Sequence, residues 1–492
     1  MVLWTRLAPD PLDGGGLPPK AIPVRWEVAN DERFKKVVAS GTEQARPELA
    51  HSVHAEVAGL RPGREYFYRF KAGREISPVG RTKTAPPARS TASELRFAFV
   101  SCQQYEHGYY TAYRRLAEED LDVVFHLGDY IYEYGANEYV AKGGNVRTHS
   151  SPEIMDLQAY RNRHAQYRSD GDLQAAHEAF PWVVTWDDHE VENNYADEIS
   201  EDGVDPALFL QRRAAAYQAY YEHMPLRRSS VPSGPDMRLY RRINFGDLVS
   251  FNVLDTRQYR DDQAAGDGTK PPNPEQADPA RTLTGAAQER WLFNNFRTTN
   301  ARWNVLAQQV FFAQQDRTEG PGQAFSMDSW DGYLGSRERV QAAFQRFGVS
   351  NPIVLTGDVH ANWANELLAD YDDPDSEVIG TEFVGTSITS GGNGADQRAD
   401  TPRLLAENPH IKFFNDLRGY VRCRVTESEW RADYRVVPFV SRKGAAISTR
   451  ASFAVQDGTP GLEQIGARAV AGARKRSGVT EGDRVRRQEL AR

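Results

Sequence analysis

The sequence contains only two cysteines, Cys102 and Cys423, in 492 residues. A framework of disulfides therefore does not hold the fold together. No run of about 18 apolar residues occurs, which argues against a membrane-spanning helix. The net charge of −8 argues against a nucleic-acid-binding surface. No signal peptide is apparent, and because residues 1–11 resemble a strand already under way, we expect the numbering to begin after a removed leader.

What the chain does contain is typical of a globular protein, with 40% hydrophobic and 26% charged residues. Residues 1–85 alternate short apolar runs with turns, which predicts a small β-sandwich domain. Within it, the segment around Tyr66 (GLRPGREYFYRF) resembles the tyrosine corner of fibronectin-type and immunoglobulin-like domains. A linker rich in Pro, Ala, Ser and Thr is expected over 86–94.

From residue 95 the pattern changes to near-continuous apolar strands that alternate with helical stretches. This predicts an α/β domain over 95–455 whose sheet is buried on both faces. Expected strands are 96–102, 122–129, 181–190, 247–257, 303–312, 351–360 and 381–389, with an antiparallel hairpin over 418–440. Expected helices are 152–169, 206–224, 284–299 and 336–349. Residues 456–492 are rich in Gly, Arg and Glu, and we expect a polar C-terminal tail there.

Four of the expected strands end in residues that can bind metals. Because ligands bind beyond the carboxyl ends of strands in such sheets, we expect one convergent site. The candidates are Cys102, Asp129 with Tyr132, Asp188 with His189, Glu190, Asn193 and Asn194, and Asp358 with His360.

The donor types at these strand ends indicate the metals. A thiolate, a phenolate, carboxylates and one imidazole suit trivalent iron, which points to Cys102, Tyr132 and His360. Oxygen donors alone suit calcium, and Asp129 is short enough to bridge two ions. Two such ions would activate a hydroxide for attack on a phosphate ester, and His189 could then protonate the leaving alkoxide.

The motifs VSCQQY, LGDYIYEY, TWDDHEVENN, LDTRQYR, VLAQQVFFAQ and LTGDVHANW occur in an order that resembles the calcineurin-like metallophosphoesterases. Within that group the chain is similar to PhoD-type alkaline phosphatases (alkaline phosphatase D). The resemblance implies a two-sheet αββα sandwich preceded by an immunoglobulin- or fibronectin-like domain. Three departures from the general metallophosphoesterase pattern, Ser-Cys, Asp-His-Glu and Gly-Asp-Val-His, are shared with this subfamily and argue against dizinc or dimanganese centres.

The same resemblance implies a role for each candidate residue. Cys102, Asp129, Tyr132 and His360 would hold Fe(III). Asp129, Asp188, Asp358 and Asn193, or Asn194 in its place, would hold one or two calcium ions. Related enzymes use the His-Glu pair of this motif in catalysis, which assigns catalytic roles to His189 and Glu190.

Other positions leave two interpretations open. Arg257 is either a clamp for the substrate phosphate or half of a structural ion pair. Cys423, His126 and His164 are expected to be packing or surface residues. The glycine-rich stretch SITSGGNG (387–394) lacks the Lys-Ser/Thr ending of a nucleotide-binding loop, so it is either a loop at the site or a turn.

The predicted function is metal-dependent hydrolysis of phosphate esters, which releases inorganic phosphate. Because the same family includes a secreted phospholipase D of streptomycete type, a phosphodiesterase acting on phospholipids or other diesters is the alternative. A degenerate binding protein is a further alternative, against which the intact ligand set argues. Family members are typically exported, so the resemblance implies a secreted or cell-envelope location.

Overall fold

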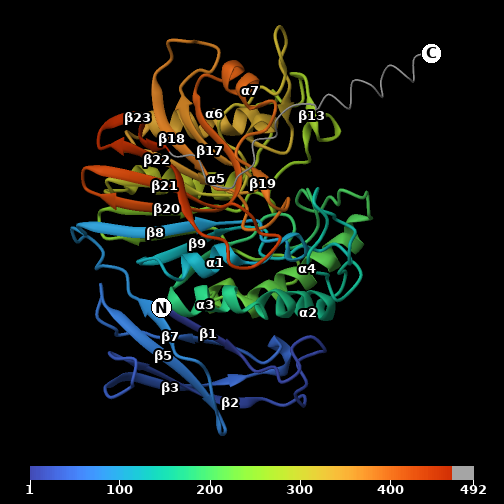
Figure 1. The fold of residues 1–492 in the computed structure, drawn as a ribbon, viewed down its shortest axis with the longest axis vertical. Helices are drawn as coiled ribbons and strands as arrows, with labels where there is room; N and C mark the ends of the chain where they lie inside the picture. The colour runs from blue at the N-terminus through green and yellow to red at the C-terminus, as the bar shows by residue number, and fades with distance from the viewer. Residues whose placement is uncertain (468–492) are drawn as a thin grey trace.

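The computed structural model describes residues 1–467 and divides into a smaller all-β part and a larger α/β part (Figure 1). In the all-β part, β1 (Val2–Arg6) pairs with β4 (Ser52–Glu56). A second sheet contains β2 (Ile22–Ala29), β3 (Val37–Ala45), β5 (Glu65–Ala72), β6 (Glu75–Ile76) and β7 (Gly80–Lys83).

A small apolar core, which includes Leu3, Val28 and Tyr66, fills this all-β part. The Tyr66 hydroxyl accepts a hydrogen bond from the Arg61 N–H at 2.9 Å. That contact between a tyrosine and nearby backbone is the geometry of a tyrosine corner. Tyr66 therefore stabilises the turn before β5 and lies among packing residues.

The α/β part is built on one large sheet. Its strand order is β10-β9-β8-β20-β17-β18-β16-β14-β12-β11; β19 and β21 also pair with β20, β22 pairs with β21, and β23 pairs with β22. The strand bounds are β8 (Glu94–Val100), β9 (Val123–Leu127), β10 (Trp182–Thr185), β11 (Arg241–Phe245), β12 (Val249–Val253), β14 (Trp303–Ala307), β16 (Pro352–Thr356), β17 (Asn362–Leu368), β18 (Val378–Val384), β19 (Gly394–Ala395), β20 (Ile411–Thr426), β21 (Glu429–Val437), β22 (Ser448–Gln456) and β23 (Thr459–Ala467). Two short strands, β13 (Thr269–Lys270) and β15 (Phe325–Ser326), pair separately.

The large sheet curls so that its two ends face each other. The rings of Phe97 in β8 and Phe125 in β9 lie 5.4 and 4.4 Å from the ring of Phe251 in β12. The long strand β20 joins the two halves, because it pairs with β17 through its first residues and with β8 through its last. An α/β fold is therefore confirmed, although hydrogen bonding connects what the sequence predicted as two separate sheets.

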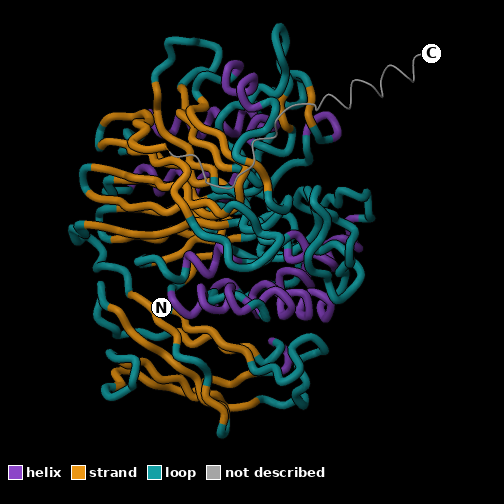
Figure 2. The backbone as a smooth tube through the Cα atoms, viewed as in Figure 1, coloured by secondary structure: helices purple, strands orange, loops and turns teal. Residues whose placement is uncertain are grey.

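Helices cover the sheet, and several of them lie between it and the all-β part (Figure 2). Their bounds are α1 (Thr111–Leu116), α2 (Leu157–Arg168), α3 (Gly171–Ala179), α4 (Pro206–His223), α5 (Gly285–Thr298), α6 (Leu334–Arg346) and α7 (Thr401–Glu407). Short 3-10 helices are η1 (Pro47–Leu49), η2 (Tyr105–His107), η3 (Arg228–Ser230), η4 (Ala264–Gly266) and η5 (Trp330–Tyr333). None of the helices among residues 1–467 is long and apolar enough to cross a membrane.

The expected polar tail over 456–492 is wrong for its first residues. Strand β23 (Thr459–Ala467) pairs with β22 (Ser448–Gln456) and extends the sheet, so the boundary expected at 455 falls inside a hairpin. The composition indicated a polar tail because β23 has few large apolar residues, although Leu462 packs against the core. Residues 468–492 of the expected tail lie outside the described residues.

Candidate metal centre

The predicted ligand positions meet where four strands end. Strands β8, β9 and β10 are parallel neighbours, so their carboxyl ends lie at one edge. The end of β16, from the other half of the sheet, reaches the same place: a Cβ atom built on Gly357 would lie 2.9 Å from Ser101. The Cys102 N–H donates to the Gly128 carbonyl at 3.1 Å, which joins the first two strand ends directly.

The backbone turns sharply at four of the predicted ligand residues. Cys102, Asp129, Asp358 and His360 have φ values of 59°, 57°, 58° and 54°. This left-handed conformation is uncommon for residues other than glycine and costs free energy at each position. Four strained residues after three of the four strands, β8, β9 and β16, indicate that the fold holds these side chains for a function.

Glycine is required next to Asp129. Gly128 has a φ of 114°, and a Cβ atom there would lie 2.4 Å from the Cβ atom of Asp187. No side chain fits in that space, so Gly128 allows the ends of β9 and β10 to approach closely.

Three overlapping clusters of donor atoms result, each with its atoms within 4.8 Å of one another. They are Cys102–Asp129–His360, Asp129–Asp188–His189 and Asp187–Asp188–Asp358. Asp129 and Asp188 each belong to two clusters. A bridging carboxylate between neighbouring sites is the arrangement that the sequence predicted for Asp129.

Tyr132 adds a phenolic oxygen to the first cluster. Its hydroxyl donates to Asp129 Oδ2 at 2.8 Å and lies 3.2 Å from His360 Nε2. It also lies 2.7 Å from the Ser390 hydroxyl, which belongs to the glycine-rich stretch 387–394. Of the two interpretations of that stretch, the structure supports a loop at the site.

The carboxylates of the centre lack partners that their burial requires. Asp129 Oδ1, Asp187 Oδ2 and Asp188 Oδ1 are buried without a hydrogen-bond partner among the described residues. Burial raises the pKa of Asp129, Asp187 and Asp358 well above the usual range, and neighbouring carboxylates add to the effect. Unpaired buried oxygens are costly, and bound cations would satisfy them. The residues present therefore fit a metal centre.

The softer donors point the same way. Burial raises the pKa of both the Cys102 thiol and the Tyr132 hydroxyl well above their usual values, and the Asp129 carboxylate adds to each effect. Burial also lowers the pKa of His360, which keeps its imidazole neutral and able to act as a ligand. A thiol and a phenol in such surroundings ionise only beside a strong positive charge.

His189 faces the centre, and Glu133 orients its ring. Its Nδ1 atom lies 2.8 Å from Glu133 Oε2, and its ring lies 4.1 Å from that of Tyr132. Burial disfavours the charged imidazole, but the carboxylates of Glu133, Asp188 and Asp129 outweigh it and raise the pKa of His189. This geometry is compatible with the predicted proton donor.

Glu190 does not face the centre. Its Oε2 atom accepts from the N–H groups of Asp129 at 3.1 Å and Asp187 at 2.8 Å, and its Oε1 atom accepts from Tyr130 N–H at 2.5 Å. Both oxygens are thus engaged with the backbone that follows β9 and β10. In place of the catalytic role expected from the resemblance, the geometry supports a positioning role for Glu190.

Arg257 is fully buried behind the acidic residues. Its Nε atom donates to Asp187 at 2.5 Å, and its two terminal nitrogens donate to Asp328 at 2.8 and 3.1 Å. A terminal nitrogen also lies 3.7 Å from carboxylate oxygens of Asp188 and Asp358. The geometry therefore favours the structural ion pair over a clamp for substrate.

The two asparagines are not equivalent. The Asn193 side chain donates to Glu201 at 2.6 Å, and its backbone N–H donates to Glu133 at 2.8 Å. The Asn194 backbone N–H donates to Asp188 at 2.8 Å, and its side chain donates to Asp267. Each side-chain amide thus donates to a carboxylate outside the three clusters, and the predicted ligand role of Asn193 stays a prediction.

Sequence reasoning missed three residues that support the centre. Glu133 orients His189, Ser390 contacts Tyr132, and Asp328 holds Arg257. Glu133 directly follows Tyr132 in LGDYIYEY, and its place on a segment rich in predicted ligands is a signal that could have been used. Asp328 lies in a long irregular segment without any local signal.

The curled α/β sheet and the shared carboxylates at its edge define an enzyme of the phosphoesterase kind. Residues 97–434 match the family described as PhoD-like phosphatase, and residues 1–86 match the PhoD-like phosphatase N-terminal domain. The chain belongs to this family, and the predicted recognition and the prediction of an enzyme are confirmed.

Two relatives are similar to the chain over nearly its whole length. Alkaline phosphatase D of Bacillus subtilis (strain 168) is 63% identical over 484 residues, which cover 98% of this chain and 83% of that protein. A solved structure described as "Structure of PhoD" superimposes with a TM-score of 0.96 at 63% identity and covers 100% of this chain and 94% of the other.

Proposed function

We propose that the protein hydrolyses phosphate esters at a centre that holds Fe(III) and calcium. The observation that carries this proposal is the overlap of the three donor clusters through Asp129 and Asp188. Membership of a phosphatase family supports it, as does the 63% identity to a protein named alkaline phosphatase D. The facing halves of the sheet also support the calcineurin-like two-layer architecture expected from the sequence.

The types of donor atom support separate binding sites for iron and for calcium. Cys102, Asp129, Tyr132 and His360 would hold the iron, because thiolate, phenolate and imidazole suit it. Asp188 and Asp358, with Asp129 as the shared residue, would hold calcium through hard oxygen donors. When bound, such ions polarise the phosphate oxygens and lower the pKa of water.

The remaining roles belong to the chain itself. His189, held by Glu133, would donate a proton to the leaving oxygen of the ester. Arg257 neutralises the carboxylates behind the ligands, and Glu190 holds the two strand ends in place. No Ser or Thr is needed as a nucleophile in this scheme, so no phosphorylated protein intermediate is expected.

The test compares hydrolysis of p-nitrophenyl phosphate and bis-p-nitrophenyl phosphate by the wild type and Tyr132→Phe, with calcium present. Faster cleavage of the monoester, lost in Tyr132→Phe, supports a phosphomonoesterase. Faster cleavage of the diester supports the phosphodiesterase alternative and makes phospholipids the next substrates to assay. Absence of both activities in metal-replete wild type contradicts the proposal.

The metal assignment has its own test. We expect Cys102→Ser to retain far less iron than the wild type but an unchanged amount of calcium, as measured by elemental analysis of the purified proteins. Cys423→Ser is the matched control, because Cys423 is equally buried but lies in β20 outside the donor clusters. Equal iron in both variants argues against thiolate ligation. Export to the cell envelope stays a proposal, which fractionation of a producing cell would test.

A further inference from the structure

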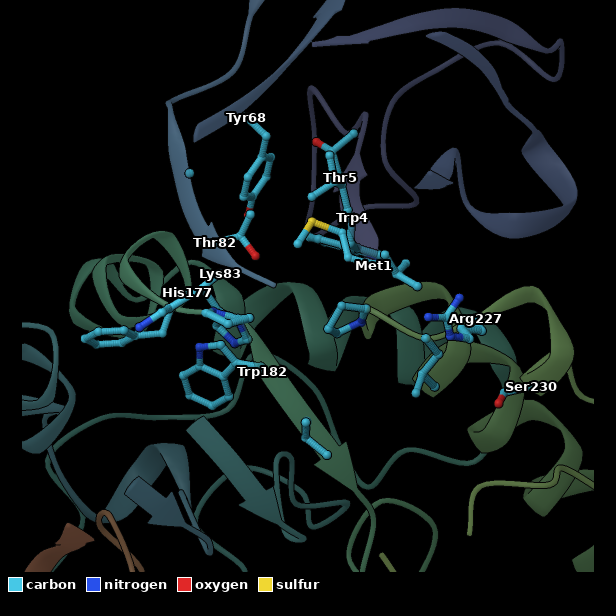
Figure 3. Close-up of a pocket in the computed structure, with 18 of the residues that line it drawn as sticks. Met1, Trp4, Thr5, Tyr68, Thr82, Lys83, His177, Trp182, Arg227 and Ser230 are labelled. Atoms are coloured by element: carbon cyan, nitrogen blue, oxygen red, sulfur yellow. The ribbon is translucent and has the colours of Figure 1, made fainter. Parts of the chain in front are cut away.

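A cavity of about 870 Å³ lies between the all-β part and the α/β part (Figure 3). Trp4 and Tyr68 reach into it from the N-terminal strands, whereas His177 and Trp182 line the opposite wall. None of the described residues that line it belongs to the metal clusters. The volume is that of a site for a small organic molecule, and such sites commonly lie between domains.

Aromatic rings form much of the wall. Besides Trp4, Tyr68 and Trp182, the lining includes Tyr240 and Trp291, whose rings lie 5.0 Å apart. Aromatic side chains on both sides of the cavity favour an apolar body between them. The apolar part of the cavity thus predicts an occupant with an aromatic or aliphatic portion.

The charge of the wall is strongly one-sided. Arg81, Arg168, Arg227, Arg238, Arg241, Arg242 and Lys83 line the cavity, whereas Glu178 is the only acidic residue in its described lining. Arg81, Lys83 and Arg227 have carboxylate partners outside it. Within the described chain, no carboxylate lies within ion-pair distance of the four remaining arginines.

Two of these unpaired arginines donate to backbone carbonyl groups, and Arg168 also donates to the Met224 sulfur at 3.9 Å. Arg241 donates to the carbonyls of Leu239 at 2.9 Å and Val184 at 2.7 Å. Arg168 donates to the His223 carbonyl and lies with its guanidinium 4.2 Å from the centre of the Trp4 ring, while its Nε atom has no partner among the described residues.

Burial makes this arrangement costly for the protein alone. It lowers the pKa of Arg241 to about 10 and also lowers that of Arg168 and Arg242. A buried cation without a counter-charge loses hydration that carbonyl groups only partly replace. An anion in the cavity would supply the missing charge.

We propose that this cavity binds a small amphiphilic oxyanion, with a phosphate-type group on the unpaired guanidinium groups and an aromatic or aliphatic body between Trp4 and Trp182. Guanidinium groups bind such tetrahedral anions through paired N–H donors. The site is independent of the metal centre and of the proposed hydrolysis. Its occupant would contact both parts of the protein and hold them together.

The test uses the complete metal-loaded protein and two fluorescent probes. 8-Anilinonaphthalene-1-sulfonate carries the anion, whereas N-phenyl-1-naphthylamine has the same rings without it. We expect the first to bind at least tenfold more tightly and to be displaced by phenylphosphonate far better than by inorganic phosphate. Equal affinity of the two probes, or displacement by inorganic phosphate as easily as by phenylphosphonate, overturns the proposal.

Variants locate the binding. Arg242→Gln and Arg238→Gln are expected to weaken binding of the sulfonate probe roughly tenfold each, the effect of losing one charged hydrogen bond. Arg346→Gln, an exposed arginine at the end of α6, is the matched control and is expected to change nothing. Unchanged affinity in both cavity variants, or electron density for phenylphosphonate only at the metal centre of a soaked crystal, refutes the site. Arg238 makes no side-chain hydrogen bond in the described structure, so its variant should fold even if Arg242→Gln does not.

Discussion

His189 Nδ1 lies 2.8 Å from Glu133 Oε2, and the same carboxylate accepts a hydrogen bond from the Asn193 backbone through its other oxygen. Glu133 is 1% exposed and His189 is 6% exposed, so solvent does not compete for this contact. The carboxylate fixes the ring so that Nε2, its other nitrogen, is the atom left to act on a substrate. Two residues 56 positions apart therefore form one hydrogen-bonded pair.

The first prediction concerns this pair. His189→Asn should lower kcat/KM for an alkyl phosphate by about 10²–10⁴-fold, because the leaving alkoxide then lacks a proton donor. The kcat/KM for p-nitrophenyl phosphate should fall much less, since nitrophenolate leaves without protonation. Glu133→Gln, which keeps the size of the side chain, should show the same dependence on the leaving group in weaker form. Steady-state kinetics with both esters measure this, and an equal loss for the two esters would argue against proton donation.

The second prediction distinguishes the two interpretations of Arg257. Arg257→Met leaves Asp187 buried without its cation and Asp328 with Arg260 alone, so the free energy of unfolding should fall by about 3–5 kcal/mol. Thermal or urea unfolding of the variant measures this loss. The matched control is Arg346→Met on the surface of α6, for which we expect no change. A raised KM with unchanged stability would instead restore the role of a substrate clamp.

The convergence of these donors could be predicted from the sequence because the predicted ligands directly follow apolar runs. Asp129 comes after β9 and Asp358 after β16, and parallel strands carry such residues to one edge. The orientation of a side chain is a different matter. Glu190 adjoins His189 in sequence, yet it turns toward backbone N–H groups while His189 faces the centre. The pattern DDHE cannot distinguish these two directions.

The remaining differences have a common physical cause, which is contact between distant segments. The edge strand β23 is stabilised by its pairing with β22 and not by its own composition, so the sequence resembled a polar tail. The cavity beside Trp4 is formed by segments more than 200 residues apart, so no local sequence pattern predicts it. Asp328 is likewise brought to Arg257 by a contact across 71 positions.

The third prediction is that metals stabilise the fold. Buried carboxylate oxygens without partners, such as Asp129 Oδ1 and Asp188 Oδ1, repel one another when no cation is present. Calcium at about 100 times its dissociation constant should raise the free energy of unfolding by about 2.7 kcal/mol. Unfolding with and without a calcium chelator, monitored by circular dichroism, measures this. Asp358→Asn should reduce this effect of calcium. If calcium does not change the free energy of unfolding of the wild type, the assignment is contradicted.

The fourth prediction is loss of stability in acid, caused by buried histidines that are not among the predicted metal ligands. His126, His164 and His223 are 0% exposed, and the rings of His164 and His223 stack with centroids 4.9 Å apart. Burial lowers the pKa of His126 to about 3 and that of His164 and His223 well below the ordinary value. These rings stay neutral in the folded protein, whereas in the unfolded chain they bind protons below a pH of about 6.5.

Stability is therefore fully present above a pH of about 6.5 and falls as the pH drops below it, because the unfolded state then binds more protons. With three such groups, the free energy of unfolding should fall by up to about 4 kcal/mol for each pH unit. His164→Phe keeps a ring in place and removes a group whose two nitrogens have no hydrogen-bond partner in the described structure. Urea unfolding between pH 7.5 and 5 measures how the free energy of unfolding changes with pH. For this variant the change per pH unit should be smaller by roughly 1.4 kcal/mol, the contribution of one proton. Metal ligands titrate equally in both proteins, so an identical slope would show that His164 is charged in the folded state.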